Sequence, residues 1–182
     1  MNFSQRHREV CNAEPLQLTP SSTDTVKLLE DILSSGSSLR IKVTGGSMYP
    51  FLKGGEILTI RKVPIASLRR GDLIFFKDSH GYPVLHRLIR KTRSDSKFVF
   101  RTKGDALVGF DEPVSHEDVL GKALKVEKSS AGCAKEINLE SPLWKKINYL
   151  AAMSGLIRSK ARFAVSKIAR TLALGLLIGS SI

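Results

Sequence analysis

The chain has 182 residues, of which 42% are hydrophobic and 25% are charged, and its formal net charge is +12. Length and composition are those of an ordinary globular protein, with one domain that can bury a core and some appended segments. The two cysteines, Cys11 and Cys133, belong to no Cys-x-x-Cys pair, so neither a zinc site nor a disulfide framework is expected. We expect no cofactor.

The N-terminal part is predicted to be an arm followed by one helix. Residues 1–22 are polar and contain no continuous apolar stretch, so we expect a flexible arm without a secretory signal. A helix is predicted over residues 23–34, and Asp24 would favour its positive end. Its apolar face has helical spacing and comprises Val26, Leu29, Ile32 and Leu33. Together these segments make residues 1–38 an N-terminal arm and helix.

Residues 39–128 change to a β pattern. Short apolar or alternating runs are separated by turns that contain Gly, Pro or Asp. The runs begin at Leu39, Ile57, Leu73, Val84, Phe98 and Val119. Many short strands at this spacing predict a mainly β fold, built as a compact and mostly antiparallel domain.

Residues 129–182 are predicted to be a linker and a basic, amphipathic helical tail. The apolar positions at helical spacing are Leu143, Ile147, Leu150, Ile157, Ala161, Ala164, Ile168 and Leu172. From Ser141 onward there are seven basic residues and no acidic one. An anionic membrane surface met through residues 143–182 is one expected partner, and an acidic protein or packing on the β domain is the alternative. The uncharged stretch 171–182 is too short to span a membrane.

Three residue types along the β region could together hydrolyse an amide. Ser47 lies in Gly-Gly-Ser-Met-Tyr-Pro at 45–50, where glycines allow a tight backbone that exposes a hydroxyl and backbone N–H groups. His86 lies in a strand-like run, and a neutral imidazole can accept a proton at physiological pH. Asp105 and Asp111 offer a carboxylate to orient the imidazole. A turn serine, a structural histidine and a hairpin Lys-Gly-Asp remain the alternatives for each taken alone.

These motifs occur in the order seen in type I signal peptidases. Over residues 39–128 the chain resembles the wider superfamily that also contains the repressor autoproteases. Besides the serine motif, the matching segments are Arg-Gly-Asp-Leu-Ile at 70–74, His-Arg at 86–87, Lys-Gly-Asp at 103–105, Asp111, and Val-Leu-Gly-Lys at 119–122. The resemblance implies a folded-over, β-rich catalytic domain of signal-peptidase type and a serine peptidase.

The resemblance also implies a role for each candidate residue. Bacterial members of the superfamily mostly use a lysine base, and His86 stands at the matching position, so the chain is similar to the histidine-type branch of the endoplasmic reticulum and archaea. By position, Ser47 is the nucleophile, His86 the general base and Asp111 the acid of the triad. Asp105 matches the nearby motif aspartate, whose role is structural or supporting.

Three features qualify this resemblance. Related enzymes often carry a serine two positions before the nucleophile, where this chain has Gly45, so the oxyanion would depend on backbone donors, chiefly the Ser47 N–H, with Thr44 nearby. Signal peptidases usually carry an N-terminal membrane anchor, which we do not find here. Met48 and Phe51 could line a substrate cleft or belong to the core.

We therefore expect a serine endopeptidase that cleaves a peptide precursor or leader, in the cytoplasm or at the periphery of a membrane. An autoproteolytic transcriptional regulator is one alternative, but it needs a DNA-reading module that is not evident, so nucleic acid is not the expected partner. A non-catalytic peptide-binding module is the other alternative. The sequence does not indicate the oligomeric state.

Overall fold

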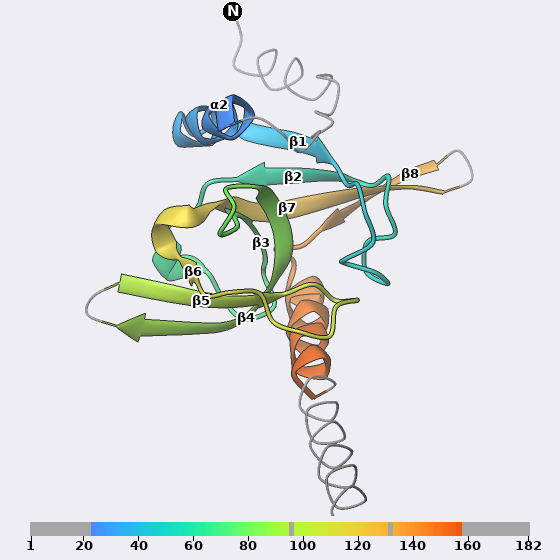
Figure 1. Cartoon of the computed structure of the whole chain (residues 1–182). Helices are drawn as coiled ribbons and strands as arrows, with labels where there is room; N and C mark the ends of the chain where they lie inside the picture. The colour runs from blue at the N-terminus through green and yellow to red at the C-terminus, as the bar shows by residue number, and fades with distance from the viewer. Residues whose placement is uncertain (1–22, 95–96, 131–132, 158–182) are drawn as a thin grey trace, which may run out of the picture.

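The structure, a computed structural model, describes residues 23–94, 97–130 and 133–157. The predicted N-terminal arm and the part of the tail after residue 157 lie outside these residues. The described chain forms a curled antiparallel sheet, with a helix packed against it near each end (Figure 1). This confirms the mainly β fold that the sequence predicts.

The strands are ordered β1-β2-β7-β3-β4-β5-β6 along the sheet, and β8 pairs with β7 beside this path. Every pair is antiparallel. The helical elements are α2 (Thr23–Ser34) and the short turns η2 (Ile65–Ser67) and η3 (His116–Asp118). The strands are β1 (Ser38–Lys42), β2 (Ile57–Arg61), β3 (Leu73–Lys77), β4 (Pro83–Ser94), β5 (Lys97–Lys103), β6 (Val114–Ser115), β7 (Val119–Ser130) and β8 (Cys133–Asn138).

Strand β3 is buried on both faces and separates two hydrophobic cores. Because side chains alternate along a strand, Leu73 and Phe75 enter the core that includes α2 and β1. Ile74 and Phe76 enter the second core, with residues of β4, β5 and β6. The run Leu-Ile-Phe-Phe therefore forms a central strand, and β4, which carries His86, pairs with it directly in the same sheet.

The predicted linker after residue 129 contains strand β8. Its residues pair with the far half of β7, from Ser130↔Cys133 to Lys125↔Asn138. Ile137 is 7% exposed and belongs to the first core, whereas the lysine and glutamate before it face solvent. One buried side chain in a charged segment was too weak a pattern to reveal this strand. The proposed division of the chain into three parts stays a prediction.

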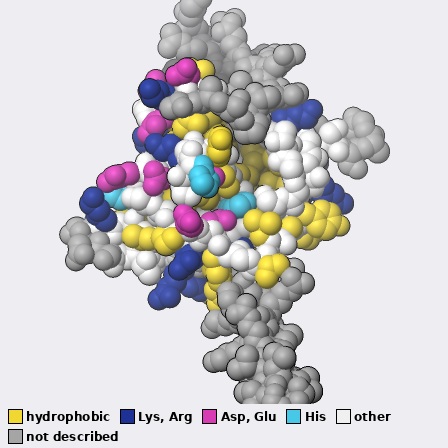
Figure 2. Space-filling view, in the orientation of Figure 1, with side chains coloured by type: hydrophobic (Ala, Val, Ile, Leu, Met, Phe, Trp, Pro, Cys, Tyr) yellow, Lys and Arg dark blue, Asp and Glu magenta, His cyan; other side chains and the backbone are white. Residues whose placement is uncertain are grey.

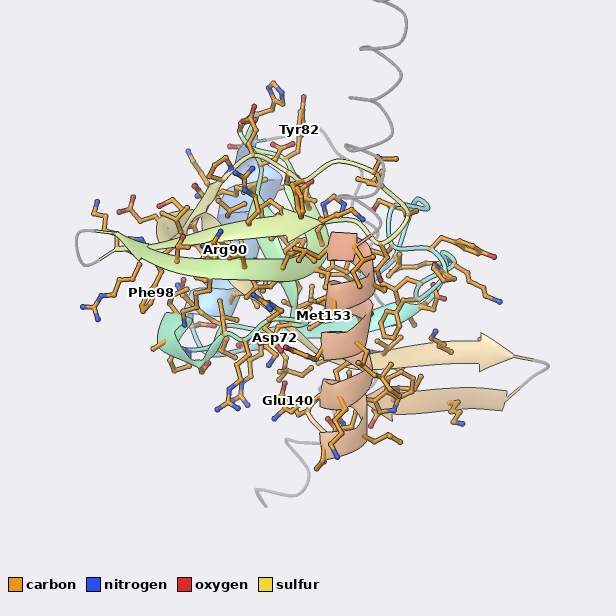
Figure 3. All side chains as sticks on the ribbon, turned by 90° about the horizontal axis from the view of Figure 1, so that it is seen from below. Asp72, Tyr82, Arg90, Phe98, Glu140 and Met153 are labelled. Atoms are coloured by element: carbon orange, nitrogen blue, oxygen red, sulfur yellow. The ribbon has the colours of Figure 1, made fainter. Side chains whose placement is uncertain are left out.

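A second helix follows β8, and its described part covers residues 142–157. It packs on the sheet domain through a face that includes Trp144, Asn148 and Ala152. Figure 3 shows it crossing the domain as seen from below, with Met153 on it and Asp72 beside it. The described part thus confirms a helix in the tail. None of the helices in the described ranges is both long and apolar enough to cross a membrane.

Candidate active site

Ser47 lies in the loop between β1 and β2, and backbone hydrogen bonds join the two ends of this loop. The Val43 N–H donates to the Glu56 carbonyl at 2.8 Å, and the Gly55 N–H donates to the Val43 carbonyl at 2.9 Å. The Glu56 carboxylate closes the returning turn by accepting from the N–H groups of Lys53 and Gly54, each at 2.8 Å. A loop fixed in this way holds the serine hydroxyl in a defined place.

The backbone around Ser47 has the form that the glycine-rich motif predicts. Gly45 has φ +87°, in the left-handed region, and a Cβ there would meet no heavy atom within 4 Å. The position is thus restricted by its backbone conformation, since a serine there would have a strained φ. The Ser47 N–H donates to no carbonyl in the described part of the chain, so it can serve an oxyanion.

His86 lies on β4 opposite Ile74 of β3, and its side chain is nearly buried. Its Nε2 is 3.1 Å from Ser47 Oγ, and its Nδ1 is 2.8 Å from Asp111 Oδ2. A carboxylate only accepts, so we assign the imidazole proton to Nδ1 and leave Nε2 to accept from the serine hydroxyl. The structure therefore brings the predicted nucleophile, base and one of the two acids into a single hydrogen-bonded line.

Asp111 is held as an anion by its surroundings. Burial alone would raise its pKa, but hydrogen bonds from His86 and Thr102, together with the nearby charges of His86 and Lys103, outweigh burial and lower the pKa. The Thr102 hydroxyl donates to Asp111 Oδ2 at 2.6 Å. The Asp111 N–H also donates to the Thr102 carbonyl at 3.0 Å, which fixes the carboxylate against β5.

Asp105 does not meet the imidazole in this structure. Its two oxygens accept from Arg87, with Nε at 2.8 Å and Nη2 at 2.6 Å. The guanidinium is completely buried, and such a charge needs a paired and hydrogen-bonded partner. Of the two candidate aspartates, Asp111 is therefore hydrogen-bonded to His86. Asp105 instead binds Arg87, the residue next to His86 in β4.

Two hollows adjoin at His86, and one of them is also lined by Ser47. The first is a groove of about 380 Å³, and its mostly apolar lining includes Ile41, Val43, Met48 and Leu85. The second has about 360 Å³ and is lined by His86 and by four acidic residues, Asp78, Asp111, Glu112 and Asp118, among others. Figure 2 shows hydrophobic side chains in the middle of this face, with histidine and acidic side chains beside them. A peptide could extend from one hollow to the other past the hydroxyl.

Met48 and Phe51, both left open by the sequence, differ in their surroundings. Met48 is 4% exposed, lines the apolar groove and also belongs to the first core. Phe51 does not line either of these hollows. Its ring lies 5.9 Å from the Trp144 ring, edge to face, and the Arg87 guanidinium lies 5.1 Å from its centroid.

Sequence reasoning missed Thr102, Glu56 and the role of Arg87 around this site. Each of these side chains reaches its hydrogen-bond partner because of strand register or a loop contact. No local sequence pattern indicates a partner of this kind. For Arg87 the sequence has one usable signal, since this charged residue alternates with the apolar Leu85 and Ile89 in the predicted strand, and the structure shows that it is completely buried. In the described ranges, no group of three or more His, Cys, Asp or Glu side chains is close enough to hold a metal ion.

Comparison with known proteins gives a partial relationship. No protein-family profile matches the chain. A stretch of 79 residues is 33% identical to signal peptidase I W of Bacillus subtilis (strain 168), and it covers 42% of each protein. The chain thus spans less than half the length of this relative. This supports a signal-peptidase-like relation over that stretch.

Proposed function

We propose that the protein is a serine endopeptidase that cleaves peptides through an acyl-enzyme. The observation that carries the proposal is the line Ser47 Oγ, His86 Nε2 and Nδ1, Asp111 Oδ2, with separations of 3.1 and 2.8 Å. The same arrangement of nucleophile, base and orienting acid recurs on unrelated folds that cut amides. The partial similarity to a signal peptidase supports the same chemistry.

The proposed reaction has two stages that share one base. Ser47 Oγ attacks the carbonyl carbon of the scissile amide while His86 Nε2 takes the hydroxyl proton. The tetrahedral intermediate collapses, the C–N bond breaks and the imidazolium gives its proton to the leaving amine. Water then attacks the acyl carbon, loses a proton to Nε2 and releases the new carboxyl end, and Ser47 recovers its proton.

Charge develops on two atoms during these steps, and the chain has a group for each. The Asp111 carboxylate, whose pKa is lowered, stays ionised at neutral pH and stabilises the imidazolium. The Ser47 N–H is available to the oxyanion. Because Gly45 has no hydroxyl to offer, the oxyanion depends on backbone donors in this proposal, and each donor of this kind contributes about 10²–10³ in rate.

A fluorophosphonate probe tests the enzyme class. Such a probe phosphonylates a serine only where a base activates it, so we expect wild type to be labelled and Ser47→Ala to be unlabelled. Circular dichroism of both proteins is the control for folding. A folded wild type that stays unlabelled would instead favour the peptide-binding module.

We propose a peptide precursor or leader as the substrate. The apolar groove beside Ser47 suits an extended chain with apolar side chains, and the hollow beyond His86 leaves room for the segment after the cut. Mass spectrometry of a peptide mixture incubated with the protein would show new termini with wild type and none with Ser47→Ala. Cleavage of the protein's own chain alone would favour the autoproteolytic alternative.

We further propose that the helix over 142–157 rests on an anionic membrane surface. Its exposed apolar side chains lie on one stripe and are Leu143, Ile147, Leu150 and Ile157, which are 36–65% exposed. Chain from Ser141 onward carries seven basic residues and no acidic one, which complements anionic lipid headgroups. An apolar stripe flanked by lysines and arginines is the pattern of a helix lying in the interface plane.

Co-sedimentation of the full chain with phosphatidylcholine vesicles, with and without phosphatidylglycerol, tests the membrane proposal. We expect binding only to the anionic vesicles, and weaker binding after Leu150→Asp. Tyr82→Asp is the matched control, because Tyr82 is also exposed but lies on the turn before β4. Equal loss of binding in both variants, or no binding by wild type, would contradict the proposal.

A further inference from the structure

The inward face of the helix over 142–157 reaches the active-site region through Asn148. This side chain is 5% exposed, and its Oδ1 accepts from Arg87 Nη1 at 2.9 Å. The same Nη1 donates to the Gly71 carbonyl at 3.0 Å. Asn148 lies 61 positions beyond Arg87 in the chain, so only the fold brings the two together.

The Asn148 contact completes the surroundings of a buried charge. Arg87 is completely buried, and its Nε and Nη2 are engaged by Asp105. Nη1 carries two hydrogens, and the carbonyl of Gly71 and the amide of Asn148 each accept one. Without the Asn148 oxygen, a charged donor would stay buried without its acceptor, which the guanidinium could relieve only by shifting.

A shift of Arg87 would move the loop that carries both aspartates. His86 and Arg87 are neighbours on β4 and point to opposite faces of the strand. Each holds one aspartate of the loop over 104–113, since Arg87 binds Asp105 and His86 binds Asp111. The two ends of this loop are thus fastened to one strand by adjacent residues.

The same loop also contacts the nucleophile. The Ala106 N–H donates to the Ser47 carbonyl at 2.9 Å. Gly104 passes so close that a Cβ there would lie 2.7 Å from the same Ser47 oxygen. The loop over 104–113 therefore touches or carries every member of the Ser47–His86–Asp111 line, and Arg87 is its anchor at the Asp105 end.

From these contacts we propose that Asn148 is a positioning residue for the active site. Through Arg87 and Asp105 it fixes the loop over 104–113, and this loop sets the positions of Asp111 and Ser47 relative to His86. The C-terminal helix is then a working part of the catalytic unit. The inference rests on the proposed peptidase function for its kinetic consequence but not for its structural one.

Asn148→Leu tests the proposal, because leucine keeps the volume of the side chain and removes the acceptor. In fluorophosphonate labelling of the full chain, we expect the maximal rate of inactivation to fall about 10- to 100-fold with an unchanged half-saturating probe concentration, as for a small misplacement of catalytic groups. Asn148→Asp keeps an oxygen for Arg87 and is expected to label at close to the wild-type rate. Asn148→Ala serves as a second variant in case leucine prevents folding.

Ala152→Gly is the matched control. Ala152 is fully buried one helical turn after Asn148. Removing its methyl group lowers the stability of the helix but removes no hydrogen bond of Arg87. We expect it to label like wild type at temperatures below its unfolding transition. If Asn148→Leu and Ala152→Gly behave alike, or if Asn148→Asp fails to restore the rate, Asn148 is only a packing residue and the inference is wrong.

Amide hydrogen exchange tests the same inference without any activity. Asn148→Leu should speed exchange at Ala106 and Asp111, whose N–H groups donate to the Ser47 and Thr102 carbonyls, while Ala152→Gly should leave both protected. Unchanged protection at both amides in Asn148→Leu would overturn the inference. Absence of labelling in wild type would contradict the proposed function alone, since the exchange experiment still decides the role of Asn148.

Discussion

Two aspartates of one loop are given different surroundings by two neighbouring residues of β4. Asp111 accepts from His86 and Thr102 in the hydrogen-bonded line that ends at Ser47. Asp105 neutralises the buried Arg87. The chemistry of the two carboxylates is the same, so the difference in role follows from which neighbour each one meets.

Asparagine substitutions should separate these roles. In Asp111→Asn the amide can donate to Nδ1 and favour the wrong imidazole tautomer, so we expect labelling and turnover to fall by about 10⁴-fold. The free energy of unfolding should fall only by the contribution of the ionised carboxylate. In Asp105→Asn a buried guanidinium loses its charged partner, so we expect unfolding to become easier by about 3–5 kcal/mol.

Urea denaturation measured beside probe labelling checks both expectations. Under conditions where it is folded, Asp105→Asn should label about 10- to 100-fold more slowly than wild type, because the loop loses its charged anchor, which is far less than the loss in Asp111→Asn. If Asp105→Asn instead abolishes labelling without unfolding, while Asp111→Asn stays active, the two assignments are reversed.

The lowered pKa of Asp111 predicts how stability depends on pH. An unfolded aspartate titrates near pH 3.9, and the folded-state pKa of Asp111 lies below its ordinary value. Ionised Asp111 therefore stabilises the fold above the unfolded pKa, and this contribution is lost as the pH falls through the folded pKa.

The free energy of unfolding of Asp111→Asn should accordingly fall less than that of wild type between about pH 5 and pH 2. Urea titrations at a series of pH values measure this difference. Parallel curves for the two proteins would mean that the carboxylate is not preferentially stabilised as an anion in the folded state.

The sequence could predict the candidate residues but not their pairing. Ser47 and His86 were found because each lies in a short motif with a distinct chemistry. Only the resemblance to signal peptidases distinguishes Asp111 from Asp105, since no spacing rule says which of two loop carboxylates meets an imidazole on another strand. Thr102 and Asn148 had no signal of their own, because their contacts depend on register and helix packing.

At the scale of elements, the helix over 142–157 docks by direct backbone contact. Gly71 has φ +98°, and a Cβ there would lie 2.8 Å from the backbone carbon of Asn148. Glycine is required at this position for two reasons. The backbone is left-handed, and the helix lies too close to leave room for a Cβ. The Arg-Gly-Asp motif at 70–72 thus turns the chain into β3 and receives the helix.

Gly71→Ala should therefore destabilise the protein more than a strained backbone alone would. Gly81→Ala is the matched control, because Gly81 has φ +81° and open space where its Cβ would be. We expect Gly81→Ala to cost about 1–2 kcal/mol and Gly71→Ala to cost clearly more, by chemical denaturation. Equal costs would mean that the helix does not pack tightly against Gly71.

The helices and strands predicted from the sequence are found in the structure where the hydrophobic residues recur with a clear helix or strand period. The helix over 23–34 and the six predicted strand runs have counterparts in α2, β1, β2, β3, β4, β5 and β7. Strand β6 has only two residues, and β8 has two adjacent charged residues among its six, so neither has an alternating pattern long enough to stand out. Both strands form because they pair with a neighbouring strand, β6 with β5 and β8 with β7, and this pairing depends on the tertiary fold.

In the whole molecule, the helix over 142–157 reaches the site region through the buried contact of Asn148 with Arg87, and none of its described residues lines either hollow. The two hollows adjoin at His86, and one of them is also lined by Ser47. Arg87 and Asn148 are buried and hydrogen-bonded to each other, and Arg87 binds Asp105 of the loop over 104–113. The helix places its apolar stripe outward, away from these contacts, so membrane docking as proposed would leave the inward contacts of Asn148 intact.

The most direct test of the central claim is to locate the phosphonyl adduct and measure its rate of formation in wild type and His86→Ala. Peptide mapping should find a single adduct on Ser47 in wild type, and the rate in folded His86→Ala should fall by about 10⁴-fold or more. An adduct on another serine, or a rate that does not depend on His86, would contradict a nucleophile activated by the Ser47–His86–Asp111 line.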